Sequence, residues 1–158
     1  MSKAFTNEDT PTPDEAEALP PRTRRFPITA VGYARLRAEL DELRKRKPEG
    51  PADVGWRRAR VLVQVLESVD ILPPSLVDGR AGFGTVVTVE DADGRHGAYE
   101  LVGPDEADVA ARKISVASPV AQALLGKRAG DAAVLRRPKG DVEVTVLSVN
   151  VPGERAIR

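Results

Sequence analysis

A reversal between two helical patterns constrains this fold more than any other feature of the sequence. Two helix-forming stretches fill residues 29–72, and the segment Pro48-Glu49-Gly50-Pro51 separates them. Because the residue before a proline disfavours helical backbone, the first helix is expected to end at Lys47. Pro51 suits the first turn of the second helix. The sequence therefore predicts a short helical hairpin that turns at residues 48–51.

Each half of the hairpin has one apolar face. Thr29 is a good N-cap for the first helix, and apolar residues then recur at helical spacing at Tyr33, Leu36, Leu40 and Leu43. The second helix is expected to continue to Leu72, with its stripe at Ala59, Leu62, Leu66 and Val69. The β-branched run at 61–65 also permits a strand, but the continuous stripe favours a helix.

The turn end of the hairpin is strongly basic. Between residues 44 and 60, seven lysines and arginines stand against two acids. The tip residues of interest are Arg44, Lys45, Arg46, Lys47, Glu49, Asp53, Arg57 and Arg58. Because lysine and arginine bind phosphates without reading base sequence, nascent RNA or nucleotide phosphates are candidate ligands. The alternative is a solvated hairpin end without a ligand. Trp56, just past the turn, is expected to pack on Leu43 rather than to anchor a partner.

The second half of the chain has the pattern of strands. Expected strands cover residues 83–90, 96–102, 114–117, 132–136 and 142–149. Turn signals separate them at 91–94 and 138–141. One short helix is expected between Ser118 as N-cap and Gly126 beyond its end. The predicted fold class is α+β: an antiparallel helical hairpin followed by an antiparallel sheet wrapped on one short helix.

The expected domain boundaries follow from these patterns. Residues 1–25 are rich in proline, threonine and acids, and cannot bury enough apolar surface to offset their ordering entropy. We expect a disordered tail there, either as an acidic arm or as a solubilising leader. The hairpin then covers residues 26–74, a linker 75–82, the β-rich domain 83–152, and a second tail 153–158.

Composition excludes several kinds of site. The absence of cysteine excludes disulfides, thiolate zinc sites and a cysteine nucleophile. The single histidine, His96, excludes a histidine-rich metal site and is expected at the surface. No apolar run reaches the length of about 18 residues that a membrane-spanning helix needs, and no signal-peptide pattern opens the chain. We expect a cytoplasmic monomer without a cofactor and without a membrane partner.

Several motifs follow one another in order along residues 28–150. The first helix carries Thr29, Gly32, Leu36, Glu39, Leu40 and Leu43. The strand region contains Phe83-Gly84-Thr85-Val86-Val87-Thr88-Val89, then Tyr99-Glu100-Leu101-Val102-Gly103 and Asp105-Glu106-Ala107-Asp108. The most specific stretch is Ile114-Ser115-Val116-Ala117-Ser118-Pro119-Val120-Ala121 with Leu124-Leu125-Gly126-Lys127. Taken together, these motifs resemble the bacterial Gre transcript-cleavage factors, which bind RNA polymerase.

The resemblance implies a coiled coil followed by an FKBP-like domain. In the Gre factors, the C-terminal domain docks at the rim of the polymerase secondary channel and the coiled coil enters the channel. Acidic residues at its tip help to hold a catalytic magnesium ion, and polymerase then hydrolyses its own backtracked RNA. The docking role carries over to Ser118, Pro119 and Val120, and also to Asp105.

Two features depart from the Gre pattern. The acidic tip motif is absent, and Glu49 and Asp53 are the only carboxylates between Lys47 and Trp56. Carboxylate oxygens suit magnesium, but the neighbouring cations oppose the binding of another cation, so we assign no metal site. The hairpin is also short, because a first helix of about 19 residues spans roughly 28 Å at about 1.5 Å per residue.

We therefore expect a regulator that docks at the secondary-channel rim, modulates or inhibits transcription and competes with Gre cleavage factors without stimulating cleavage. We do not expect an enzyme. One alternative is a genuine transcript-cleavage factor. Alternatives of another class are an FKBP-like peptidyl-prolyl isomerase and an RNA-binding module. An isomerase pocket would require aromatic side chains, and the β-rich domain has only Phe83 and Tyr99.

Overall fold

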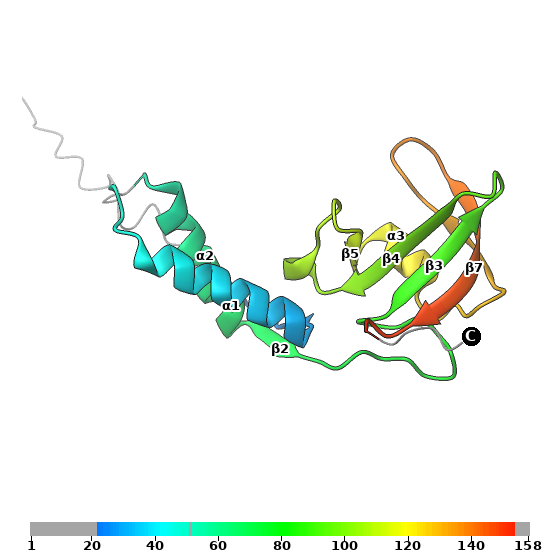
Figure 1. Ribbon diagram of the computed structural model, residues 1–158, viewed down its shortest axis with the longest axis horizontal. Helices are drawn as coiled ribbons and strands as arrows, with labels where there is room; N and C mark the ends of the chain where they lie inside the picture. Colours follow the sequence, from blue (N-terminus) through cyan, green and yellow to red (C-terminus); the bar gives the residue numbers. More distant parts are fainter. Residues whose placement is uncertain (1–21, 51, 154–158) are drawn as a thin grey trace, which may run out of the picture.

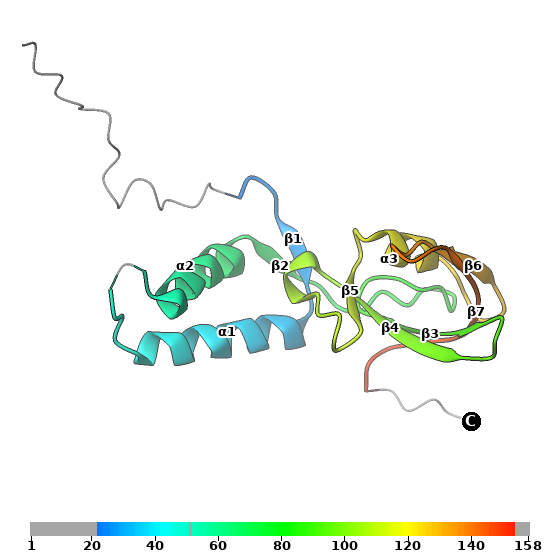
Figure 2. The ribbon, with the colours of Figure 1, turned by 90° about the horizontal axis from the view of Figure 1, so that it is seen from above.

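The computed structural model describes residues 22–50 and 52–153. A helical hairpin lies at one end of the molecule and a curled β-sheet at the other (Figures 1 and 2). Residues 1–21, most of the expected N-terminal tail, lie outside the described residues, as does nearly all of the expected tail at 153–158. Helices and sheet together confirm the α+β fold class.

The hairpin consists of α1 (Ala30–Lys45) and α2 (Val54–Glu67). The side chain of Thr29 caps α1 by accepting a hydrogen bond from the backbone N–H of Gly32 at 3.0 Å. Between the helices, the buried side chains are Leu36 and Leu40 from α1 and Leu62 and Val65 from α2. The 16 residues of α1 correspond to a length of about 24 Å.

The second helix ends before the position that the sequence pattern predicts. Ser68 stops α2, because its N–H donates to the carbonyl of Val65 and its hydroxyl donates to the carbonyl of Gln64. The following residues form β2 (Val69–Ile71), which pairs in parallel with β1 (Phe26–Ile28). The prediction of a helix as far as Leu72 is therefore wrong. Helical spacing cannot reveal this pairing, because the partner strand precedes α1.

The sheet has five strands in the order β5-β4-β3-β7-β6. They are β3 (Val86–Asp91), β4 (His96–Val102), β5 (Lys113–Ser115), β6 (Ala132–Leu135) and β7 (Val142–Asn150). The prediction of a purely antiparallel sheet is wrong in one place, because β5 runs parallel to β4. Between these two strands the chain passes through the short 3-10 helix η1 (Pro104–Glu106) and a turn, so that β5 runs in the same direction as β4.

One helix, α3 (Pro119–Leu124), packs on the sheet. Ser118 caps it as expected, and Gly126 beyond its end has a φ of 78°, which favours glycine. The buried Ala121 and Leu124 of this helix share a core with apolar residues from the strands, including Val87 and Leu101. This helix therefore covers part of one face of the sheet.

A buried carboxylate joins the hairpin to the β-rich domain. Glu106 is 1% exposed and accepts hydrogen bonds from the N–H of Thr29 at 2.8 Å, from the Thr29 hydroxyl and from the N–H of Gly103 at 3.1 Å. Nearby, Arg22 forms a bidentate ion pair with Asp105. Residue 22 thus has a defined contact, although the sequence pattern places it in the tail. We refer to Arg22, Thr29, Gly103, Asp105 and Glu106 as the junction.

Candidate functional site

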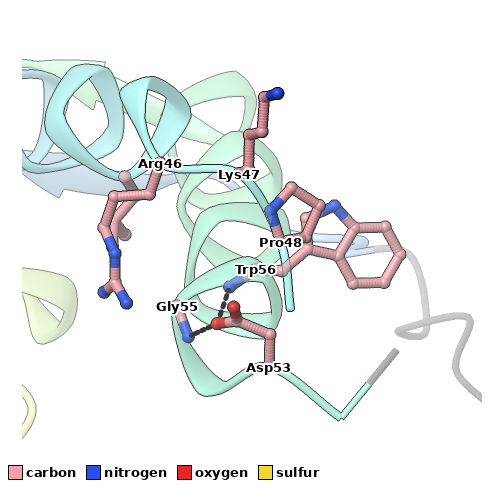
Figure 3. Close-up of a pocket in the computed structure, with 7 residues that line it drawn as sticks. Arg46, Lys47, Pro48, Asp53, Gly55 and Trp56 are labelled. Carbon is pink, nitrogen blue, oxygen red and sulfur yellow. Dashed lines mark hydrogen bonds between the residues drawn. The ribbon is translucent and has the colours of Figure 1, made fainter. Parts of the chain in front are cut away.

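The tip of the hairpin is organised by Asp53, the N-cap of α2 (Figure 3). One carboxylate oxygen accepts hydrogen bonds from the N–H groups of Gly55 at 2.7 Å and Trp56 at 3.2 Å, and the other accepts from the N–H of Glu49 at 3.0 Å. These bonds, chiefly those from Glu49 and Trp56, lower the pKa of Asp53. Both oxygens are therefore used to hold the turn.

Two of the basic tip residues pair with acids of α1. Arg58 binds Glu39 at 2.7 and 3.1 Å, and this hydrogen bonding lowers the pKa of Glu39 and raises that of Arg58. The ammonium group of Lys45 lies 2.5 Å from Glu42, which raises the pKa of Lys45. These pairs leave less net positive charge at the tip than the sequence count suggests.

Other tip residues surround a very small cavity. It has a volume of about 20 Å³, and its lining includes Leu43, Arg46, Lys47 and Trp56. This is space for about one water molecule and not for a nucleotide. Trp56 lines the cavity beside Leu43 and remains 37% exposed, and the guanidinium of Arg60 lies 5.1 Å from the centre of its ring. A tip ligand would therefore bind on the surface.

The tip does not fit a metal ion. Within residues 22–50 and 52–153, no group of three or more histidines and carboxylates is placed to hold one. Asp53 has committed both oxygens to backbone N–H groups, and Glu49 is the only other carboxylate of the turn. A magnesium ion prefers a nearly complete octahedron of oxygens and keeps several waters. One uncommitted carboxylate among cations is a poor site for it.

The predicted docking residues occupy two elements that both contact β5. The Ser118 hydroxyl accepts a hydrogen bond from the N–H of Ala121 at 3.2 Å, Pro119 is exposed, and Val120 is half-buried against the core. Asp105 belongs to η1, where its carboxylate is held by Arg22. Pro119 is therefore the member of the set that lies most open to a partner.

His96 lies at the surface at the start of β4. Its Nε2 atom is 2.9 Å from a carboxylate oxygen of Glu90, and its side chain is mostly exposed.

Among the described residues, no helix is both long and apolar enough to cross a membrane.

Sequence reasoning missed the junction. Glu106 appeared there only as part of an acidic motif, and acidic residues are usually exposed. The sequence signal that could have revealed it is the pair of glycines at positions 32 and 103. A Cβ added at Gly32 would lie 1.9 Å from the Glu106 carboxylate, and one at Gly103 would lie 1.8 Å from the carbonyl oxygen of Pro27. Two glycines that tolerate no side chain mark a close contact between distant segments.

Residues 76–151 match the family described as transcription elongation factor, GreA/GreB, C-term. A transcription elongation factor GreA of Nitratidesulfovibrio vulgaris is 36% identical over 156 residues, which cover 82% of this chain and 98% of the relative. A transcription elongation factor GreB of Pseudomonas aeruginosa is also 36% identical, covering 84% of this chain and 95% of the relative. The crystal structure of GreA factor homolog 1 (Gfh1) of Thermus thermophilus is 29% identical, covers 80% of this chain and 99% of that one, and has a TM-score of 0.43.

The match to the N. vulgaris protein also reveals a difference in length. It runs over 156 positions, whereas 82% of the 158 residues of this chain is only about 130. The relative therefore has about 26 residues, 156 less 130, that this chain lacks within the matched stretch.

The same matches overturn one expectation from the sequence. From the sequence we expect no enzyme, but the relatives are transcription elongation factors GreA and GreB. Factors of this kind stimulate transcript cleavage by RNA polymerase, although the catalyst is the polymerase. The expectation is therefore wrong, because it left out the part that such factors have in a reaction catalysed by the polymerase.

Proposed function

This chain belongs to the GreA/GreB family of transcription elongation factors, and we propose that it acts on bacterial RNA polymerase as a short-hairpin regulator. In this proposal the β-rich domain docks at the rim of the secondary channel through Ser118, Pro119, Val120 and Asp105. The hairpin enters the channel mouth, modulates or inhibits transcription and competes with Gre cleavage factors. The protein acts in the cytoplasm as a monomer.

The state of Asp53 carries this proposal. A cleavage-stimulating tip has to offer carboxylate oxygens to a metal ion held by polymerase. Here both oxygens of Asp53 accept hydrogen bonds from backbone N–H groups of the turn. Releasing them would remove the N-cap of α2 and leave backbone donors without partners. The tip therefore supports occupation of the channel rather than delivery of a metal ligand.

The reach of the hairpin supports the same conclusion. An α1 of 16 residues gives a rod of about 24 Å. The N. vulgaris GreA has about 26 more residues in the matched stretch. If they are shared between the two arms of its hairpin, they lengthen each arm by about 20 Å at about 1.5 Å per residue. A factor shortened by that distance and docked at the same rim would end well outside the active site.

The charge at the tip agrees with a role at the channel mouth. Arg46 and Lys47 are exposed and form no ion pair within the described residues. Their positive charge would attract an acidic channel wall or the phosphates of RNA, and it would oppose the recruitment of a divalent cation. The tip is therefore suited to electrostatic contact inside the channel.

The test uses backtracked elongation complexes with end-labelled RNA and the cognate polymerase. The protein is added alone, and then in increasing amounts against a GreA of ordinary length. We expect no RNA shortening by the protein alone and progressive suppression of cleavage by the GreA. Shortening by the protein alone would instead assign it as a genuine transcript-cleavage factor.

A variant of one docking residue tests whether competition with GreA depends on docking by the β-rich domain. Pro119→Ala changes an exposed side chain at the first position of α3 and leaves the Ser118 cap in place. We expect this variant to compete less well with GreA while retaining its fold by circular dichroism. Equal competition by the variant and the wild type would contradict the docking assignment.

A further inference from the structure

One of the clefts on the β-rich domain lies outside the tip and outside the predicted docking residues. Its volume is about 200 Å³, and its lining includes Val89, Gly97 and Val144. Figure 1 shows the β3–β4 turn and the β6–β7 loop, which both border it, at the same end of the sheet. Val89 and Val144 belong to the core that Ala121 and Leu124 of α3 complete. The cleft thus continues the face of the sheet that α3 covers only in part.

Three arginines from separate elements line this cleft: Arg95 beside the β3–β4 turn, Arg112 just before β5, and Arg137 in the β6–β7 loop. Within residues 22–50 and 52–153, Arg112 and Arg137 form no ion pair. Arg95 has one long contact, 3.7 Å to Asp93, between two largely exposed side chains. Such a contact adds little, so all three guanidinium groups are available to a ligand.

The other polar groups of the lining do not cancel this charge. Asp91 is the one acid among the lining residues, and one of its oxygens already accepts hydrogen bonds from the N–H groups of Asp93 and Arg95. His96 is paired with Glu90. The lining of the cleft consequently has a net positive charge.

The backbone at Arg112 suggests a role for its side chain. Its φ is 55°, in the left-handed region where glycine and asparagine are favoured. The guanidinium extends to Gly97, where an added Cβ would lie 3.5 Å from Nη1 of Arg112 and 3.7 Å from the Tyr99 ring. Arg112 therefore holds a backbone conformation that a glycine would adopt without strain, and its guanidinium and the Tyr99 ring both lie near Gly97.

We propose that this cleft binds a pyrophosphate group, either free or as part of a nucleoside diphosphate. Guanidinium groups donate paired hydrogen bonds to phosphate oxygens, and three of them converge here on one short cleft. Concentrated charge of this kind matches adjacent phosphates better than the spaced carboxylates of an acidic peptide. The half-buried Tyr99 in the lining gives a nucleoside an aromatic ring to contact. This composition also disfavours the isomerase alternative, which requires an aromatic pocket.

The test is isothermal titration calorimetry on the full chain at constant ionic strength. The probes are sodium pyrophosphate, ADP and a hexaglutamate peptide. Arg112→Gly removes one guanidinium and relieves the left-handed backbone, so misfolding would not explain a loss of binding. Arg137→Ala removes a second from an exposed loop. Arg136→Ala is the control, because Arg136 is the exposed neighbour of Arg137 and does not line the cleft.

We expect one saturable site for pyrophosphate or ADP, weakened about tenfold or more by Arg112→Gly and by Arg137→Ala and unchanged by Arg136→Ala. Tighter binding of ADP than of pyrophosphate would identify a nucleotide ligand, and equal binding would identify the pyrophosphate group alone; both support the site. Absence of saturable binding, an equal loss in the Arg136 variant or preferential binding of hexaglutamate would overturn it. The measurement uses no polymerase and is therefore independent of the function proposed above.

Discussion

Replacing Glu106 with alanine tests whether the junction holds the hairpin against the β-rich domain. The variant removes the acceptor of three hydrogen bonds, two from Thr29 and one from the N–H of Gly103. Each buried donor left without an acceptor costs about 1–3 kcal/mol. Relief of the cost of burying a carboxylate offsets part of this loss. We therefore expect Glu106→Ala to lower the free energy of unfolding by about 3–5 kcal/mol.

Two companion variants separate the hydrogen bonds from the packing. Glu106→Gln keeps one carbonyl oxygen as an acceptor, and a loss of about 1–3 kcal/mol is expected. Gly32→Ala would raise helix propensity by about 1 kcal/mol, but its Cβ would lie 1.9 Å from the Glu106 carboxylate. We expect Gly32→Ala to destabilise the protein despite the better helix former. A stabilising effect of Gly32→Ala would show that the Glu106 side chain moves aside at little cost.

The assay is urea unfolding followed by circular dichroism, with small-angle X-ray scattering to follow the maximum dimension of the chain. Glu143→Ala, which removes an exposed glutamate on β7, is the control and should lie within about 0.5 kcal/mol of the wild type. If Glu106→Ala unfolds at the same urea concentration as Glu143→Ala and keeps the wild-type scattering profile, then Glu106 does not hold the junction.

Three further predictions concern the tip and the docking surface. The pKa values of Asp53 and Glu39 are lowered. The stability that these carboxylates contribute is therefore complete above the ordinary carboxyl pKa of about 4 and is lost as the pH falls through the lowered folded-state values. The urea concentration at the unfolding midpoint should decrease when the pH is lowered from about 5 to about 2.5, and a constant midpoint would contradict the capping role. Changing Ser118 and Pro119 together to alanine should weaken polymerase binding, measured by co-elution, while a cooperative thermal transition is retained; unchanged binding would exclude this surface. Lys47→Glu should reduce any effect on transcription in a runoff assay, and wild-type activity would show that the tip charge has no role.

Local signals in the sequence predicted much of the fold. The caps at Thr29 and Ser118 and the glycine after α3 all lie where expected, because a cap depends on hydrogen bonds within about four residues. The β3–β4 and β6–β7 turns also lie where the turn residues indicate. The roles given to the docking residues remain predictions, since they came from the family resemblance rather than from local chemistry.

The sequence by itself determined the elements whose hydrogen bonds close within a few residues: the two helices of the hairpin, the β-turns and the start of α3. Only the tertiary structure decided the parallel pairing of β1 with β2, the parallel placement of β5 and the burial of Glu106. Thr29 and Glu106 are 77 residues apart in sequence, and the three arginines of the cleft come from three different connections. Contacts of this kind depend on how separate elements pack, and no local pattern of residue types encodes that packing.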